Sequence, residues 1–238
     1  MNQGHQAQGA AVTHPVQFKG SRTARLILRA LGWSYRFNGL PSLQGVIVVY
    51  PHTSNWDFVI GILLKWAMGI QAHFWGKDTL FKVPVLGPWI RWLGGIPIHS
   101  QSSNGVVGQT IDHLNQCRDQ QQLFWLALAP EGTRSKTPGW RTGFYQVAWG
   151  AQVPLGVARF DWTHKCLDLS HFLTLTGDMD ADFKRMAELL DGATGARPEQ
   201  AGPVQAWVKA SPDQAMNQPL DQRSGTGPGT STHSSSNA

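Results

Sequence analysis

Residues 46–57 read VIVVYPHTSNWD, an apolar run that stops at a proline and opens onto a histidine and an aspartate. The β-branched run at 46–50 has turn residues on both sides, which is typical of a strand buried on both faces of a sheet. Ser54 or Asn55 can cap a helix that follows. Asp57 would then lie in the first helical turn, where the helix dipole favours a negative charge.

This stretch also carries groups that can transfer protons. A histidine at the exit of a buried strand is held rigidly while one ring nitrogen stays open, so His52 is a candidate general base. Asp57 is the candidate group that orients its ring. Taken alone, a histidine and an aspartate at this spacing are more often structural groups than catalytic ones.

A second apolar run, LFWLALA at 123–129, again ends in a proline and is followed by Glu131, Gly132, Thr133, Arg134 and Ser135. The glycine lets backbone approach a ligand closely, and the guanidinium can form paired hydrogen bonds with a phosphate. In isolation the same residues also suit a turn with a surface ion pair. Ligands of open α/β sheets bind at the carboxyl ends of strands, so we expect both loops to face one cleft.

The remaining pattern alternates strands and helices, which predicts a single α/β domain with a mainly parallel or mixed sheet flanked by helices. The domain is expected to span 18–196. Polar or low-complexity tails at 1–17 and 197–238 are expected to be disordered. Helices are expected near 19–33, 58–70, 80–93, 105–119, 143–150 and 183–190, and further strands near 72–75, 94–100, 153–160 and 165–169.

Composition points to anionic partners. The chain has a net charge of +5, only 15% charged residues and 11 tryptophans among 238 residues. Such a surface suits phosphates, nucleic acid or acidic lipid, and tryptophan favours the membrane interface. The basic amphipathic helix at 19–33 fits either an anionic membrane surface or an ordinary place on the core. Beyond it the cations form no stripe and no recognition motif appears, so we expect no nucleic-acid partner.

The sequence contains no signal for a membrane span, a secreted protein or a zinc site. The longest apolar segment, at 58–70, is shorter than a bilayer span and contains Lys65, and no secretory signal opens the chain. The two cysteines lie far apart, which favours a cytoplasmic protein without a disulfide framework. A zinc site built from His52, Asp57, His73 and His99 has no recognised ligand spacing, so no metal is expected.

Taken together, His-x4-Asp after one buried strand and Pro-Glu-Gly-Thr-Arg-Ser after another resemble the glycerolipid acyltransferase family, which includes 1-acylglycerol-3-phosphate acyltransferases. The resemblance covers roughly residues 20–195. It implies a glycerol-3-phosphate acyltransferase-like fold, with His52 as general base and Asp57 as its orienting residue. It also implies that Glu131, Gly132, Thr133 and Arg134 bind the acceptor, and that 153–157 lies on the acyl-donor side.

The same resemblance implies a substrate pair and a location. The acyl donor would be acyl-CoA or acyl-carrier protein, with no separate cofactor, and the acceptor a lysophospholipid, first of all 1-acylglycerol-3-phosphate. The protein is expected to act in phospholipid biosynthesis as a cytoplasmic protein that lies peripherally on the inner face of the membrane. A non-catalytic lipid-binding module with this fold is the alternative from another class.

One block departs from the family pattern. Residues 94–100 align with a motif that typically closes in an acidic residue and an arginine, and here His99 and Ser100 stand there. Losing one charge-assisted contact to phosphate costs about 1.5–3 kcal/mol. Nearby cations can replace it, or the acceptor is another lyso-lipid such as a lyso-aminolipid. The candidate cations are Lys77, Lys82, Lys136 and Arg141.

Overall fold

A computed structural model describes residues 16–98 and 103–207, apart from the side chains of residues 103 and 104. Its described residues form one seven-stranded sheet in the order β1-β7-β6-β2-β5-β3-β4. The strands are β1 (Ser34–Phe37), β2 (Gln44–Tyr50), β3 (Ala72–Lys77), β4 (Gly95–Ile98), β5 (Phe124–Leu128), β6 (Leu155–Asp161) and β7 (Cys166–Leu173).

The sheet is mixed but mainly parallel. Every pairing between neighbours is parallel except β6 with β7, which are joined by a tight turn and run antiparallel. The strand β2, which contains the apolar run at 46–50, lies between β5 and β6, with Val46 level with Leu126 on one side and Leu155 on the other. The predicted α/β class with a mainly parallel or mixed sheet is therefore confirmed.

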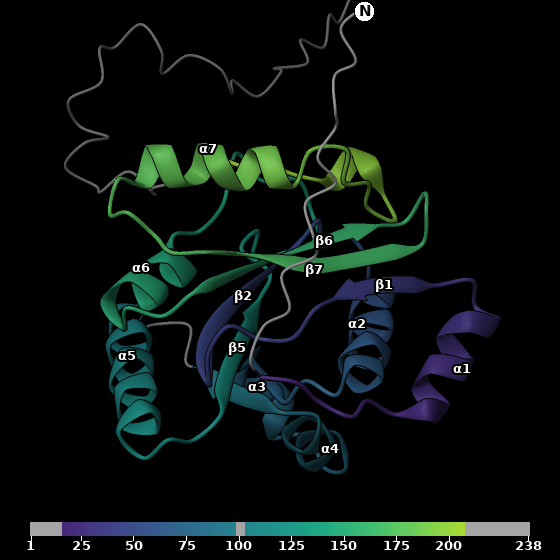
Figure 1. The fold of residues 1–238 in the computed structure, drawn as a ribbon, viewed down its shortest axis with the longest axis horizontal. Helices are drawn as coiled ribbons and strands as arrows, with labels where there is room; N and C mark the ends of the chain where they lie inside the picture. The colour runs from purple at the N-terminus through teal and green to yellow at the C-terminus, as the bar shows by residue number, and fades with distance from the viewer. Residues whose placement is uncertain (1–15, 99–102, 208–238) are drawn as a thin grey trace, which may run out of the picture. The chain divides into compact units, whose positions relative to one another are not determined.

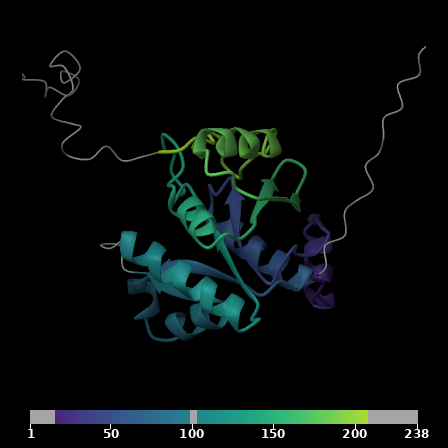
Figure 2. The same cartoon turned by 60° about the vertical axis from the view of Figure 1, so that its left-hand side comes forward.

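Helices cover both faces of the sheet (Figures 1 and 2). One face packs against α5, α6 and α7, and the other against α1 and α2. None of the described helices is long and apolar enough to cross a bilayer. The helices are α1 (Arg22–Ala30), α2 (Asn55–Met68), α3 (Asp78–Phe81), α4 (Leu86–Trp92), α5 (Ser103–Asp119), α6 (Gly143–Gly150), α7 (Met179–Leu189) and the 3₁₀ turn η1 (Pro198–Gln200).

The central strand owes its place to its apolar run. Because side chains alternate along a strand, Val46 and Val48 enter the core beneath α5 and α6, whereas Ile47 enters the core beneath α1 and α2. All three are buried. Only a strand that is covered on both faces needs apolar side chains at successive positions. This is why an unbroken β-branched sequence marks the middle of the sheet.

Two elements differ from the expectation drawn from sequence. The edge strand β1 was not predicted, because it is four residues long and alternates exposed with half-buried side chains. The domain also continues to Trp207 instead of ending at residue 196, since Trp207 N donates to Trp140 O. At the other end, Val16 pairs with Leu40, so the N-terminal boundary lies slightly before residue 18.

Some expectations fall outside the described residues. These are the tails at 1–15 and 208–238, and the two positions, His99 and Ser100, where the family pattern is broken.

Candidate active site

The turn from β2 into α2 is closed by Asp57. Its Oδ2 accepts hydrogen bonds from the backbone N–H groups of Thr53 and Ser54, both at 2.7 Å. Ser54 is the helix N-cap, as expected from sequence, and its hydroxyl accepts from Trp56 N at 3.2 Å. Together these contacts form a capping box, which fixes the direction in which the chain enters the helix.

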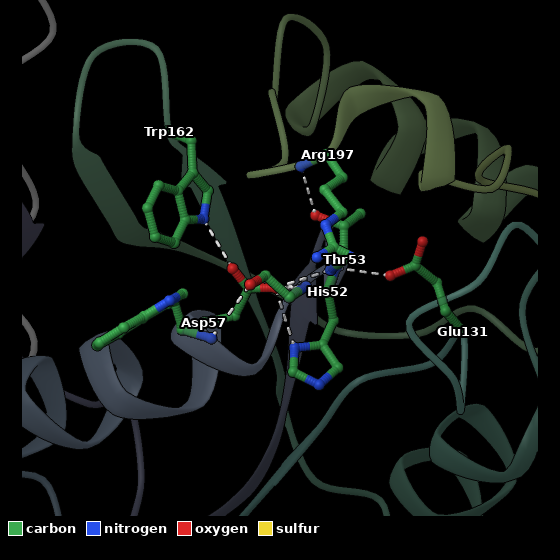
Figure 3. A network of polar contacts seen from close by, with 8 residues as sticks. His52, Thr53, Asp57, Glu131, Trp162 and Arg197 are labelled. Carbon is green, nitrogen blue, oxygen red and sulfur yellow. Dashed lines mark hydrogen bonds and ion pairs between the residues drawn. The ribbon is translucent and has the colours of Figure 1, made fainter.

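The same carboxylate faces His52. His52 Nδ1 lies 3.3 Å from Asp57 Oδ2, and the imidazole is 20% exposed whereas the carboxylate is buried. Figure 3 shows the second ring nitrogen of His52 pointing away from Asp57. A carboxylate at Nδ1 favours the tautomer that leaves Nε2 free to accept a proton. The structure thus brings the predicted pair together in an arrangement suited to base catalysis.

A third side chain, which sequence reasoning missed, completes the surroundings of Asp57. Trp162 Nε1 donates to Asp57 Oδ1 at 2.7 Å, from the turn between β6 and β7 (Figure 3). Trp162 lies 105 positions from Asp57 in the chain, so no local pattern could have paired them. The only signal in the sequence is a tryptophan inside an otherwise polar turn.

Glu131 has a different position from the one expected. It was predicted to bind the acceptor, but its side chain is buried, with 1% of the residue exposed. Its Oε2 accepts from His52 N at 2.6 Å and its Oε1 from Gly202 N at 3.1 Å. Burial raises the pKa of Glu131, while these two backbone donors lower it in part. In this structure Glu131 supports the backbone of His52 and does not face solvent.

We therefore expect Glu131→Ala to lower the free energy of unfolding by about 1–3 kcal/mol, because the buried N–H of Gly202 and the partly buried N–H of His52 lose their acceptor. Chemical denaturation measures this change. Glu199→Ala is the matched control, since Glu199 is an exposed acid in η1 and should change stability little. Equal stability of the two variants would contradict a supporting role for Glu131.

The segment after residue 196 forms one wall of the site. Arg197 N donates to Thr53 Oγ1 at 3.1 Å, and Tyr50 donates through its hydroxyl to Gly202 O at 2.9 Å. With the contact from Gly202 to Glu131, this segment fastens the loop that carries His52 to the loop that follows β5. Its Pro- and Gln-rich composition concealed this role in the sequence.

The loop after β5 presents the other predicted binding residues to solvent. Gly132, Thr133 and Arg134 are exposed. Gly132 adopts a left-handed conformation with φ of 67°, and a Cβ there would lie 2.8 Å from Arg141 Nε. Arg141 therefore packs over the glycine, which places a second guanidinium beside the loop of Arg134. Two such groups can bind one phosphate with paired hydrogen bonds.

The described residues contain no group of three or more His, Cys, Asp or Glu side chains that could hold a metal ion. His73, one of the residues considered for such a site, stacks instead on Phe124 with a ring separation of 4.8 Å.

A comparison with models of protein families identifies the family of this chain. A family model described as Acyltransferase matches residues 35–157, which is 123 of the 238 residues and includes both loops. Among solved structures, the crystal structure of the 1-acyl-sn-glycerophosphate (LPA) acyltransferase PlsC from Thermotoga maritima is similar at 17% identity and a TM-score of 0.48. The match covers 70% of this chain and 73% of that one. A comparison with curated proteins gives no match. The chain therefore belongs to the acyltransferase family.

Proposed function

We propose that this acyltransferase moves a fatty acyl group from acyl-CoA or acyl-carrier protein to the hydroxyl of a lysophospholipid, most simply 1-acylglycerol-3-phosphate. The observation that carries the proposal is the contact between His52 and Asp57 at the carboxyl end of β2, beside the cationic loop that follows β5. In the proposed reaction His52 activates the acceptor hydroxyl, and the guanidinium groups of the neighbouring loop bind its phosphate.

The proposed reaction begins with a proton transfer to His52. His52 Nε2 takes the proton of the acceptor hydroxyl as its oxygen attacks the thioester carbonyl carbon. Asp57 stabilises the imidazolium that forms. When the tetrahedral intermediate collapses, the carbon–sulfur bond breaks and His52 returns the proton to the departing thiolate. The products are the diacylated lipid and the free thiol, and the histidine is restored for the next cycle.

The acceptor phosphate is proposed to lie against Arg134 and Arg141. Both belong to the loop region after β5, and Arg141 was one of the cations considered as a replacement for the missing motif arginine. A guanidinium binds phosphate with two parallel hydrogen bonds, each charge-assisted. This supports a phosphate-bearing acceptor over a lyso-aminolipid, because the one acidic side chain of this loop, Glu131, is buried and accepts from the backbone of His52 and Gly202.

An acceptor panel tests the assignment. Purified protein is given acyl-CoA or acyl-carrier protein and, in turn, lysophosphatidic acid, a neutral lysophospholipid and a lyso-aminolipid, and acylated product is measured by mass spectrometry. We expect turnover to be highest with lysophosphatidic acid. Preference for the lyso-aminolipid would exclude lysophosphatidic acid as the main acceptor. No transfer to any acceptor would exclude the proposed enzymatic activity.

We further propose that the protein works on a membrane surface, through a tryptophan face made by α2 and α4. Along α2, Trp56, Val59 and Trp66 share one stripe because they are separated by three and seven residues. All three are exposed. Trp66 contacts Trp92 of α4 with ring centroids 5.7 Å apart, so the two helices present one continuous surface. The face also contains Trp89 and Val85, which are exposed as well.

Charge on this side of the molecule favours an anionic bilayer. The segments α1, α2 and α4 contain a single acidic residue, Asp57, which is buried. Beside α2, the helix α1 exposes Arg22 and Arg29, while its Ala24 and Leu28 are buried in the core. Interfacial tryptophans flanked by cations are the usual composition of a surface that lies at lipid headgroups. Since Trp56 follows His52 by four residues, such binding brings the site close to the bilayer.

We expect Trp66→Ser combined with Trp92→Ser to weaken binding to anionic phospholipid vesicles by about 10-fold or more, because the buried apolar area drives interfacial binding. Co-sedimentation with vesicles measures the partition coefficient. Arg22→Gln with Arg29→Gln should weaken it by about 30-fold, at about 1 kcal/mol per cation, and only when the vesicles are anionic.

The control is Trp149→Ser, which removes an exposed tryptophan from α6 on the opposite face of the sheet and should leave binding unchanged. All variants should retain turnover with detergent-dispersed acceptor. If the control weakens binding as much as the paired substitutions in α2 and α4, the tryptophan face is not the bound surface.

A further inference from the structure

We propose that Trp162 is a positioning residue for the reaction, since its indole N–H holds Asp57 in the orientation that serves His52. This inference rests on the proposed function, because it gives Trp162 a part in the same proton transfer. The contact is a single hydrogen bond of 2.7 Å from Trp162 Nε1 to Asp57 Oδ1.

The turn that carries Trp162 is itself held firmly. Asp161 is buried, and its carboxylate accepts from Thr194 Oγ1 at 2.7 Å and from His164 N at 3.1 Å, with His164 Nδ1 also 2.7 Å away. The backbone N–H of Trp162 donates to Thr194 O at 2.9 Å. These contacts fix the backbone from which the indole extends, so the ring has little freedom to leave Asp57.

Packing fixes the ring as well. Trp162 makes an edge-on contact with Trp33, with centroids 5.1 Å apart and planes at 89°. Trp33 is in turn buried against Phe160, with centroids 5.2 Å apart. This chain of aromatic contacts connects the indole to the hydrophobic core beneath α1 and α2. Aromatic pairs of this geometry stabilise a defined ring orientation.

The donors around Asp57 explain what the indole contributes. The backbone N–H groups of Thr53 and Ser54 approach Oδ2, and Trp162 approaches Oδ1. Backbone amides and indole can only donate, so both oxygens must act as acceptors. Donors to both oxygens thus hold the carboxylate in the orientation in which Oδ2 faces His52 Nδ1. Without the indole, Oδ1 is a buried acceptor without a partner and the carboxylate can turn about its bond to Cβ.

The test compares two replacements of Trp162 in the full-length protein. Trp162→Phe retains an aromatic ring against Trp33 but removes the N–H. Incorporation of 3-benzothienylalanine at position 162 retains the whole shape and replaces only the N–H with sulfur. We expect both to lower kcat by about 10-fold to 100-fold, as is found when a partner that orients a reactive side chain is lost. KM for donor and acceptor should change by less than about twofold, because the role proposed for the indole is to hold Asp57 and not to bind a substrate.

Two controls separate positioning from packing. Trp33→Phe weakens the aromatic contact but leaves the N–H of Trp162 in place, and Trp149→Phe changes an exposed tryptophan on α6. Both should retain kcat within about threefold. Wild-type kcat in the benzothienyl protein, or an equal loss in Trp33→Phe, would overturn the proposal.

A readout independent of turnover distinguishes this inference from the proposed function. The ¹⁵N chemical shifts of the His52 ring report its tautomer, which a fixed Asp57 should hold with the proton on Nδ1. We expect a mixture of tautomers in the benzothienyl protein and a single tautomer in the wild type. If the wild type transfers no acyl group, the proposed function is wrong. If the benzothienyl protein has the same His52 tautomer as the wild type, the role of Trp162 is wrong, whatever the turnover.

Discussion

His52→Ala is expected to lower kcat/KM for acyl transfer by about 10²–10⁴-fold, the usual contribution of a positioned general base. The fold should survive the change. What anchors this residue is its backbone, whose N–H donates to Glu131, while the side chain is partly exposed. Melting temperature should therefore stay close to that of the wild type, so the loss can be assigned to chemistry.

The measurement is steady-state turnover with acyl-CoA and lysophosphatidic acid. His171→Ala is the matched control, because His171 is an exposed histidine on β7 and its loss should leave turnover unchanged. Added imidazole should restore part of the activity of His52→Ala, since a free base can enter the space left by the ring. Undiminished turnover in the variant would exclude His52 as the base.

Asp57→Asn is expected to lower kcat by about 10²–10⁴-fold and to destabilise the fold by about 1–3 kcal/mol. All the groups that approach Asp57 are donors, from Thr53, Ser54 and Trp162 together with the ring of His52. An asparagine has one oxygen and one NH₂ group, so in either orientation a donor meets a donor. The neutral side chain also no longer stabilises the imidazolium formed during proton transfer.

Chemical denaturation and turnover measure the two effects separately. Asp180→Asn supplies the control, because it makes the same change in the first turn of another helix, α7, where the side chain is exposed. Its effect on stability should be within about 1 kcal/mol, and turnover should not change. Turnover of Asp57→Asn within about threefold of wild type would show that His52 does not depend on this carboxylate.

Local patterns were enough to locate the reactive loops. Both central strands are apolar on two faces and stop at a proline, and each is followed by polar groups, so their position at the carboxyl edge follows from the sheet itself. Residue type limited the N-cap of α2 to Ser54 or Asn55, and the structure identifies Ser54, with Asp57 completing a capping box. Such features depend on residues close together in sequence, which is why they can be read from it.

The edge strand β1 cannot be recognised from a local sequence pattern. Its four residues become a strand because their backbone pairs with β7, and its side chains show no apolar pattern. The segment after residue 196 is similar, since its Pro- and Gln-rich composition suggests a tail although Gly202 and Arg197 hold the site together.

By itself the sequence indicated the α/β class and a strand buried on both faces at 46–50, because both depend on short-range periodicity, and it offered His52 and Asp57 as a candidate pair. Tertiary structure decided what surrounds that pair. It turned Glu131 inward to the backbone of His52 and brought Trp162 to Asp57, from residues 79 and 105 positions away. These are individual hydrogen bonds between distant parts of the chain, and only the packing of β5 and β6 on either side of β2 fixes which donor meets which acceptor.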